Sequence, residues 1–267
     1  MINIEELIEE YKEEGYSERN AEARVCQDIV LKAIKESGLS KNVTIKGGVV
    51  MRNLTNDVRR ATQDIDLDFI RYSLDEKAIY RFVDELNCIE GISIRINGQI
   101  EELSQQEYRG KRIKTTIEDN NGNTVFSKID LGVHKNLQID QEDYCFDIFM
   151  DNEGVYLLAN SKEQIFAEKL RALLKFGALS TRYKDVYDLC YLCEYVEKEK
   201  LMDCINVYIF SDSDMRESNI TDIRNRLDNT FSNTTYIEHL ESTKKADWLG
   251  IQPATAIKRI EDFLECF

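Results

Sequence analysis

The sequence contains little proline and glycine, which form turns, and little histidine, the residue that most often acts as a general acid or base. Its 267 residues include one proline, 12 glycines and two histidines. So little proline and glycine is unusual in an all-β protein, which needs many turns, and it favours long helices. With only His134 and His239 in the chain, we do not expect a mechanism centred on histidine.

Long apolar runs and a secretion signal are also missing. No stretch of about 18 apolar residues occurs, so we expect no membrane-spanning helix. The chain starts with acidic residues, whereas a secretory signal starts with basic residues followed by an apolar segment. The seven cysteines are an odd number and lie far apart, which disfavours a disulfide framework. Together these observations predict a cytoplasmic protein.

The chain has an excess of acidic residues. It contains 35 Lys and Arg against 50 Asp and Glu, a net charge of −15, which excludes a protein that coats DNA through overall basicity. The charge is uneven, because segments 41–72, 108–135 and 155–189 carry +2, +3 and +2, and the rest of the chain therefore carries −22. We expect a neutral to basic cleft in an acidic shell, which would attract anionic ligands.

The hydrophobic pattern changes near residue 160. Before it, period-two segments typical of strands are mixed with two helices near 17–37 and 75–87. The expected strands are 43–45, 64–69, 92–96, 112–118, 125–133, 145–150 and 155–158. After it, helical spacing continues, and Ser161 with Gln164 fits a capping box. We predict an α+β fold with a mixed β-sheet domain flanked by helices over 1–158, followed by a helical C-terminal domain over 159–267.

The most informative short motif is Asp64-Ile65-Asp66. Aspartates that alternate with Ile65, Leu67 and Phe69 predict a strand with one apolar face and one acidic face. Asp64 and Asp66 would then point the same way, about 6.5–7 Å apart. A divalent cation such as Mg²⁺ relieves the repulsion between two carboxylates held in this way. A solvated edge strand explains the same pattern without a metal.

Two neighbouring motifs favour the metal-binding interpretation. Gly47-Gly48 lies at an expected strand-to-helix turn, where backbone amides can approach a phosphate, although an ordinary turn has the same sequence. Asp130 lies on a later apolar strand and supplies a third carboxylate that would complete a metal site. Asp119 and Asp147 remain alternatives for that third acid.

These residues resemble the AbiEii/AbiGii toxin family of nucleotidyltransferases, within the polymerase-β-like nucleotidyltransferase superfamily. The resemblance covers about residues 40–195 in four ordered segments. The segments are Lys46-Gly47-Gly48 with Arg52, Arg60-Ala61-Thr62 with Asp64-Ile65-Asp66-Leu67, 167–173 (AEKLRAL) and 182–189 (RYKDVYDL). One departure is the phosphate turn, which is Gly-Ser in many superfamily members and Gly-Gly here, so that backbone amides must replace the serine.

The resemblance implies a role for each matching residue. The residues implied in nucleotide binding are Lys46, Gly47, Gly48, Arg52, Arg60, Thr62 and Lys169. The residues implied in binding Mg²⁺ or Mn²⁺ are Asp64, Asp66 and Asp130. Asp130 would also help to deprotonate the acceptor hydroxyl. Lys169 would contact the triphosphate, and Asp185 would orient Lys169 or the substrate. The resemblance leaves open whether Asp188 is functional or structural.

The resemblance also implies the reaction and its setting. A Mg²⁺-dependent nucleotidyltransferase would move a nucleoside monophosphate from an NTP to a hydroxyl acceptor and release pyrophosphate. The acceptor would be the 3′ end of a tRNA or another RNA, or a protein side chain. The family suggests the toxin of a bacterial toxin–antitoxin or phage-defence system, with an antitoxin protein as a partner. Two alternatives are a small-molecule enzyme similar to those that adenylylate aminoglycosides, and an inactive nucleotide-binding module.

Two further patterns lie in the helical part. Cys190 and Cys193 form a CxxC motif, but no second pair completes a zinc site, so we expect a buried helix face. Tyr183, Tyr187 and Tyr191 recur at helical spacing and form one stripe. We expect this stripe to pack between the two domains, with stacking on a base as the alternative.

Overall fold

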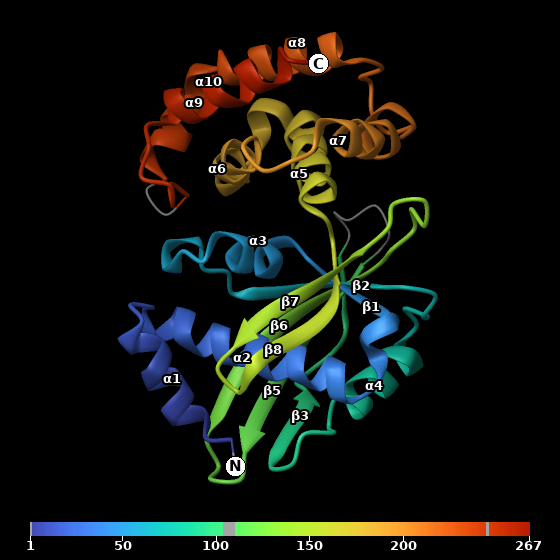
Figure 1. Ribbon diagram of the computed structural model, residues 1–267, viewed down its shortest axis with the longest axis vertical. Helices are drawn as coiled ribbons and strands as arrows, with labels where there is room; N and C mark the ends of the chain where they lie inside the picture. The colour runs from blue at the N-terminus through green and yellow to red at the C-terminus, as the bar shows by residue number, and fades with distance from the viewer. Residues whose placement is uncertain (1, 104–109, 244–245) are drawn as a thin grey trace. The chain divides into compact units, whose positions relative to one another are not determined.

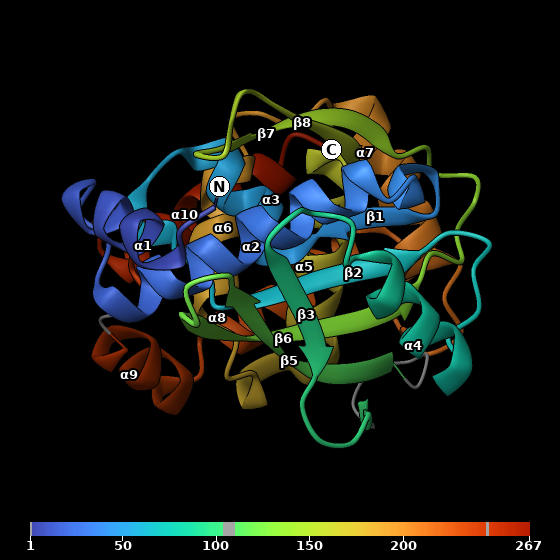
Figure 2. The same cartoon turned by 90° about the horizontal axis from the view of Figure 1, so that it is seen from below.

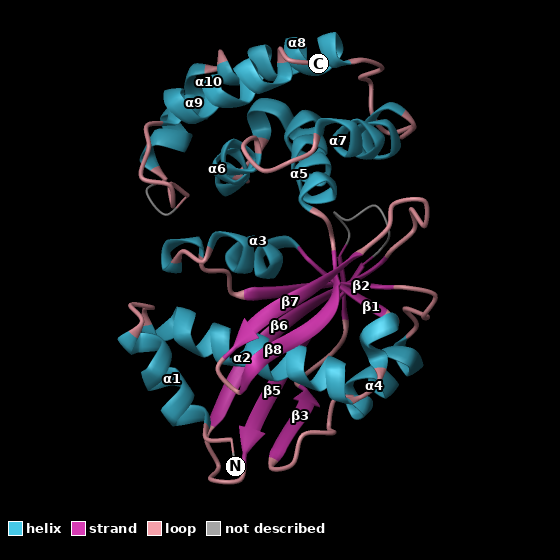
Figure 3. Cartoon of the chain, in the orientation of Figure 1, coloured by secondary structure: helices cyan, strands magenta, loops and turns pink. Residues whose placement is uncertain are grey.

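The computed structural model describes residues 2–103, 110–243 and 246–267. The chain divides into two compact units, Met1–Asn160 and Ser161–Phe267, here called the sheet unit and the helical unit (Figure 1). Figure 3 shows that the strands lie in the first unit and that the second unit is helical. The predicted α+β class is confirmed.

The sheet unit interleaves helices and strands. Its helices are α1 (Ile4–Glu13), α2 (Glu18–Glu36), α3 (Gly47–Thr55) and α4 (Glu76–Glu85), with short 3₁₀ turns at Leu39–Lys41 and Val58–Arg60. Its strands are β1 (Val43–Lys46), β2 (Asp64–Phe69), β3 (Ile92–Ile96), β4 (Glu101–Leu103), β5 (Gly110–Asp119), β6 (Thr124–Val133), β7 (Glu142–Ile148) and β8 (Asp151–Ala159).

The eight strands form one mixed sheet. Its order is β3-β5-β6-β2-β1-β8-β7, and β4 also pairs with β5. The pairs β2–β6 and β1–β8 are parallel, and the other pairs are antiparallel. The acidic strand β2 therefore lies inside the sheet, between β1 and β6, and is not the solvated edge strand that would explain its charge without a ligand.

Strand β2 has the two different faces that its sequence predicts. Ile65, Leu67 and Phe69 are fully buried, and burying each such side chain contributes about 1.5–3 kcal/mol. The Phe69 ring contacts Phe82 of α4, with ring centroids 5.0 Å apart. Helix α2 packs against β6 and β8, and Figure 2 shows it crossing the sheet. The aspartates of β2 point to the opposite face, because side chains alternate along a strand.

Helix α1 is docked rather than frayed, although its sequence is rich in glutamate. Ile4 and Tyr11 are buried. The backbone N–H of Ile4 donates to Asp119 Oδ2 at 2.9 Å, and the Tyr11 hydroxyl donates to Asp28 of α2. The N-terminal helix is therefore fixed to both α2 and the β5–β6 hairpin.

The helical unit contains six α-helices within the described residues. They are α5 (Lys162–Phe176), α6 (Tyr183–Leu192), α7 (Lys198–Ile205), α8 (Ile220–Phe231), α9 (Thr234–Ser242) and α10 (Pro253–Leu264), with a 3₁₀ turn at Gly177–Leu179 and a π-helical turn at Asn206–Phe210. Ser161 caps α5 by accepting from the backbone N–H of Gln164 at 3.1 Å. The Gln164 side-chain amide donates to Tyr208 and to Glu168, which holds the first turn of α5 in place.

The tyrosine stripe of α6 finds ring partners inside the helical unit. Tyr183 contacts Tyr236 with centroids 5.5 Å apart, Tyr191 contacts Trp248 at the same separation, and Tyr187 is buried. These contacts arise because Tyr236 of α9 and Trp248 pack against α6, which the local sequence pattern does not reveal. Among the described residues, no helix is long and apolar enough to cross a membrane.

Candidate active site

Strand register places four charged residues in one row across the sheet. Asp66 of β2 pairs with Asp130 of β6 on one side and with Lys46 of β1 on the other. Asp130 in turn pairs with Arg112 of β5. Adjacent strands lie about 4.8 Å apart, so Arg112, Asp130, Asp66 and Lys46 follow one another across one face. Three of these four were predicted site residues.

Asp64 lies beside this row on the same face. It precedes Asp66 by two residues on β2, and it pairs with Lys128 of β6. Asp64 and Asp66 are each partly exposed, whereas Asp130 is buried. The sheet therefore brings Asp64, Asp66 and Asp130 together with two of the three carboxylates accessible from solvent.

Asp130 is held by an arginine. The Arg112 Nε and Nη2 atoms donate to the two carboxylate oxygens of Asp130 at 2.6 and 2.7 Å. The hydrogen bond to Asp130 raises the pKa of the Arg112 guanidinium. This bidentate pairing engages both oxygens. Within residues 2–103, 110–243 and 246–267, no group of three acidic, histidine or cysteine side chains is arranged to hold a metal ion.

The glycine turn between β1 and α3 lies directly against the acidic row. Gly47 has a φ of +61°, and a Cβ atom at this position would lie 2.3 Å from Asp66 Oδ2. A Cβ atom on Gly48 would lie 2.4 Å from the Thr62 hydroxyl oxygen. Only glycine allows both close approaches. The predicted phosphate turn, Thr62 and Asp66 therefore form one continuous site.

Lys46, at the end of β1, lies over the third aspartate of β2. Its ammonium is 2.7 Å from Asp68 Oδ1. A Cβ on Gly132 would lie 2.1 Å from the same oxygen, so the glycine of β6 leaves the space that this carboxylate occupies. Lys46 is thus fixed beside Asp66 by an ion pair with Asp68.

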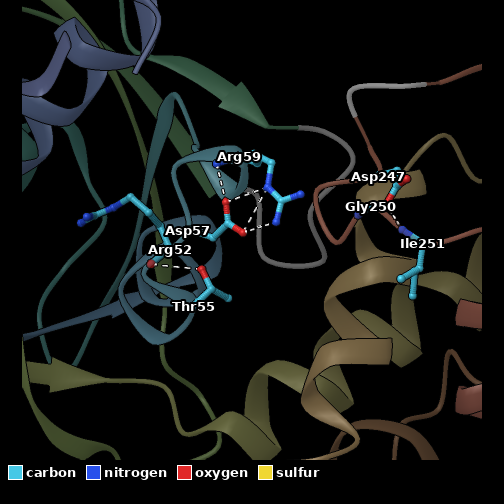
Figure 4. A network of polar contacts seen from close by, with 7 residues as sticks. All are labelled: Arg52, Thr55, Asp57, Arg59, Asp247, Gly250 and Ile251. Atoms are coloured by element: carbon cyan, nitrogen blue, oxygen red, sulfur yellow. Dashed lines mark hydrogen bonds and ion pairs between the residues drawn. The ribbon is translucent and has the colours of Figure 1, made fainter. Parts of the chain in front are cut away.

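Arg52 and Arg60 lie in the interior. Arg52 belongs to a buried cluster with Arg24 and Asp28, and its pKa is lowered to about 10 by burial and by the nearby Arg24. In Figure 4 its guanidinium points away from the neighbouring pair of Asp57 and Arg59, while its carbonyl accepts from Thr55. Arg60 is also buried. The structure does not bring Arg52 into the row of acids.

The two other candidates for the third acid are placed elsewhere. Asp119 lies at the far end of β5 from Arg112, about 23 Å away along the strand, and caps the β5–β6 turn by accepting from Asn121 and Asn123. Asp147 lies on the edge strand β7. Register therefore favours Asp130.

His134 follows β6 and is buried there. Its backbone N–H donates to Phe69, and its ring lies 3.5 Å from the Gln141 amide. Burial lowers the pKa of its imidazole. These contacts are those of a structural histidine at the end of the strand.

The helical unit contains the second predicted set, joined by ion pairs. Lys169 Nζ of α5 lies 2.5 Å from Asp185 Oδ1 and 2.8 Å from Asp188 Oδ2, both on α6. Arg182 Nε donates to Asp185 Oδ2 at 2.6 Å. Burial alone would raise the pKa of Asp185, but Lys169 and Arg182 bring it below its usual value. The stabilisation from Asp185 is thus present above about pH 4 and is lost as pH falls through the lowered pKa.

Replacing Lys169 by methionine is expected to destabilise the helical unit by about 3 kcal/mol, because two buried carboxylates lose their shared cation. Denaturant unfolding followed by the fluorescence of the sole tryptophan, Trp248, measures this loss. Lys175→Met on the same helix is the control. Its ion pair with Asp214 is more exposed, so a loss of at most about 1 kcal/mol is expected. Equal losses in the two variants would contradict the buried network.

The family described as "Nucleotidyl transferase AbiEii toxin, Type IV TA system" matches residues 29–262. No curated protein matches the chain. Among solved structures, the nucleotidyltransferase toxin MenT4 of Mycobacterium tuberculosis H37Rv is similar, with a TM-score of 0.54, 12% identity and coverage of 97% of this chain and 99% of that one.

Two other solved structures have lower scores. JHP933 of Helicobacter pylori has a TM-score of 0.44 and 14% identity, and the alignment covers 94% of this chain and 97% of the JHP933 chain. An antigenic nucleotidyltransferase-like protein of Paracoccidioides brasiliensis has a TM-score of 0.45 and 16% identity, and the alignment covers 80% of this chain and 93% of that protein. At these identities the MenT4 similarity supports the fold, and the family match identifies the chemistry.

Proposed function

Because this chain belongs to the AbiEii family of nucleotidyltransferase toxins, we propose that it transfers a nucleoside monophosphate from a Mg²⁺-bound NTP to a hydroxyl acceptor. The observation that carries this proposal is the position of Asp66. It lies against the Gly47 turn and is in register with Asp130, with Asp64 two residues away on the same face. These carboxylates would hold the divalent cation, which would supply the charge neutralisation that nucleotidyl transfer requires.

The residue types would fit a hard divalent cation once Arg112 has released Asp130. Asp64 and Asp66 offer carboxylate oxygens on one face of one strand, and Asp130 offers a third carboxylate across the ladder. When bound, Mg²⁺ supplies charge neutralisation for the triphosphate and for the attacking oxygen. The backbone amides of Gly47 and Gly48 hold the phosphates at the start of α3. Lys46 adds positive charge beside Asp66.

The proposed transfer forms one bond and breaks one. The acceptor oxygen attacks the α-phosphorus, and the bond from that phosphorus to the bridging oxygen of pyrophosphate breaks. Once Arg112 no longer pairs with Asp130, the Asp130 carboxylate takes the proton of the acceptor hydroxyl. Pyrophosphate leaves with the electrons of the broken bond. In this proposal Lys169 contacts the triphosphate, and Asp185 orients Lys169. No histidine or cysteine is needed for this chemistry.

The ion pair between Arg112 and Asp130 leads to a prediction about metal binding. In Arg112→Gln, Asp130 loses its cation, so the metal-free protein is expected to melt about 4–8 °C lower. Added Mg²⁺ replaces the missing charge, and it should therefore raise the melting temperature of the variant more than that of the wild type. Thermal shift with and without Mg²⁺ measures both effects. An identical Mg²⁺ response in the two proteins would argue against Asp130 as a ligand.

The face that bears the acids continues as a surface suited to RNA. On β6, Phe126 is 67% exposed and Lys128 is exposed. In the ladder Phe126 pairs with Thr116, which pairs with the exposed Arg95 of β3, and Lys128 pairs with the exposed Lys114. Aromatic rings stack on bases and lysines attract the backbone. This pairing favours an RNA 3′ end over a protein or an aminoglycoside as the acceptor.

Phe126→Ala is expected to raise the KM for the RNA acceptor about 10-fold, because stacking of one base is lost, while the KM for the NTP stays unchanged. Lys128→Ala should lower the slope of log binding constant against log salt by about 1. Transfer assays and RNA binding at several salt concentrations measure these effects. Tyr80→Ala is the control, because Tyr80 is a half-exposed aromatic residue on α4. Equal effects of the Tyr80 and Phe126 variants would contradict the RNA surface.

The family also suggests a setting, in which this enzyme is the toxin of a toxin–antitoxin or phage-defence pair with an antitoxin protein as partner. The reaction is tested by incubating the protein with each of the four α-labelled NTPs and with total RNA, total protein or an aminoglycoside. Label should enter RNA, and the double variant Asp64→Ala/Asp66→Ala should transfer none. Equal labelling by the double variant would remove the proposed function.

A further inference from the structure

Trp248 is the sole tryptophan of the chain and lies far in sequence from the segments that resemble the family, which end at residue 189. It is 2% exposed and follows α9. Its indole Nε1–H donates to Asp188 Oδ1 at 2.9 Å, across 60 residues of sequence. A buried indole usually directs its N–H to a partner. The partner here is one of the two carboxylates that bind Lys169.

The segment around Trp248 is held in place by its own hydrogen bonds. The carboxylate of Asp247 accepts from the backbone N–H groups of Gly250 and Ile251 at 2.7 and 3.2 Å (Figure 4). The Trp248 backbone N–H donates to the Ala246 carbonyl at 3.0 Å. The Tyr191 ring lies against the indole at 5.5 Å. The indole N–H therefore has a fixed direction.

The two carboxylates around Lys169 differ in their other partners. Asp188 is completely buried, and its oxygens receive the Trp248 N–H and the Lys169 ammonium. Asp185 receives Lys169 and Arg182, and the Arg182 side chain is 57% exposed. The network therefore runs from Trp248 in the interior to Arg182 at the surface. Asp188 is the carboxylate nearest the interior end, and the neutral indole N–H of Trp248 donates to it.

We propose that Trp248 is a positioning residue for Lys169, acting through Asp188. The terminal torsion of an aspartate is broad, so an unrestrained carboxylate rotates readily. The indole N–H fixes one oxygen of Asp188, and this leaves the other oxygen directed at the Lys169 ammonium. The inference rests on the proposed function, in which Lys169 contacts the triphosphate. It gives the C-terminal segment a part in nucleotide transfer.

A double-mutant cycle separates positioning from packing. Trp248→Phe keeps an aromatic ring and removes the N–H, and Asp188→Asn keeps the shape and removes the charge. Trp248→Phe should lower kcat/KM for the NTP about 10-fold, as the loss of an orienting partner does in metal sites. If Trp248 acts through Asp188, the double variant should be no worse than Asp188→Asn alone. Losses that multiply would overturn the proposal. Tyr195→Phe, in the ring that stacks on Tyr191, is the unaffected control.

Fluorescence tests the same contact in folded protein that keeps Trp248. Asp188→Asn should shift the emission of the sole tryptophan, and saturating NTP with Mg²⁺ should shift it in the wild type only. Binding of NTP to the wild type, measured by calorimetry, without a change in emission would overturn the proposal. If the wild type transfers no label, the proposed function fails. In that case, unchanged emission in Asp188→Asn would separately refute the contact between Trp248 and Asp188.

Discussion

Asp66→Asn is expected to lower nucleotide transfer by about 10³-fold, as removal of one charge-stabilising group does in phosphoryl transfer. The substitution keeps the size of the side chain and removes its charge. Asp66 is the acid that contacts the phosphate turn and also pairs with Asp130 and Lys46. The variant should fold normally, because Asp66 is partly exposed. Initial rates of α-label transfer measure the loss.

The control is Asp143→Asn, which changes an exposed carboxylate on the edge strand β7 of the same sheet. It should transfer label at the wild-type rate. If Asp66→Asn retained more than about a tenth of that rate, the two-carboxylate account of the site would be wrong. Removal of a carboxylate that binds the metal should reduce the transfer rate by more than this.

Gly47→Ala is expected to lower transfer by about 10²- to 10³-fold, the size of effect that follows loss of a well-placed electrostatic group. A Cβ atom would lie 2.3 Å from Asp66 Oδ2, so the carboxylate must move out of the phosphate turn. Alanine at a φ of +61° also costs about 1–2 kcal/mol of stability. Transfer rates and thermal melting measure the two effects separately.

Gly98→Ala provides the matched control for Gly47→Ala. Gly98 also has a positive φ, +86°, but no neighbouring atom lies within 4 Å of the position that a Cβ atom would take there. The variant should therefore lose a similar amount of stability and keep full activity. Equal activity losses in the two variants would show that backbone strain, and not displacement of Asp66, explains the effect.

Local patterns in the sequence were sufficient to predict much of the sheet. The alternation of aspartates with Ile65, Leu67 and Phe69 specifies the two faces of β2, because the side-chain period of a strand is two. Gly47-Gly48 predicts the strand-to-helix turn because glycine alone tolerates the positive φ and the close contact. Strand β3 has the predicted bounds.

Contacts between distant segments could not be predicted in this way. The pair of Arg112 and Asp130 depends on the register of the β5–β6 hairpin. Trp248 meets Asp188 across 60 residues of sequence, so no local pattern indicates this hydrogen bond. The motif that suggested a nucleotide-binding role for Arg52 carries no information about burial, and the structure places this arginine with Arg24 and Asp28.

The most direct test of the central claim is the position of the label that the enzyme transfers. In parallel reactions, one NTP carries ³²P in the α-phosphate and the other carries it in the γ-phosphate, with RNA as the acceptor and Mg²⁺ present. Nucleotidyl transfer by the site around Asp64 and Asp66 predicts that the α-label enters RNA while the γ-label leaves in pyrophosphate. Entry of the γ-label into RNA, or no entry of either label, would contradict the account.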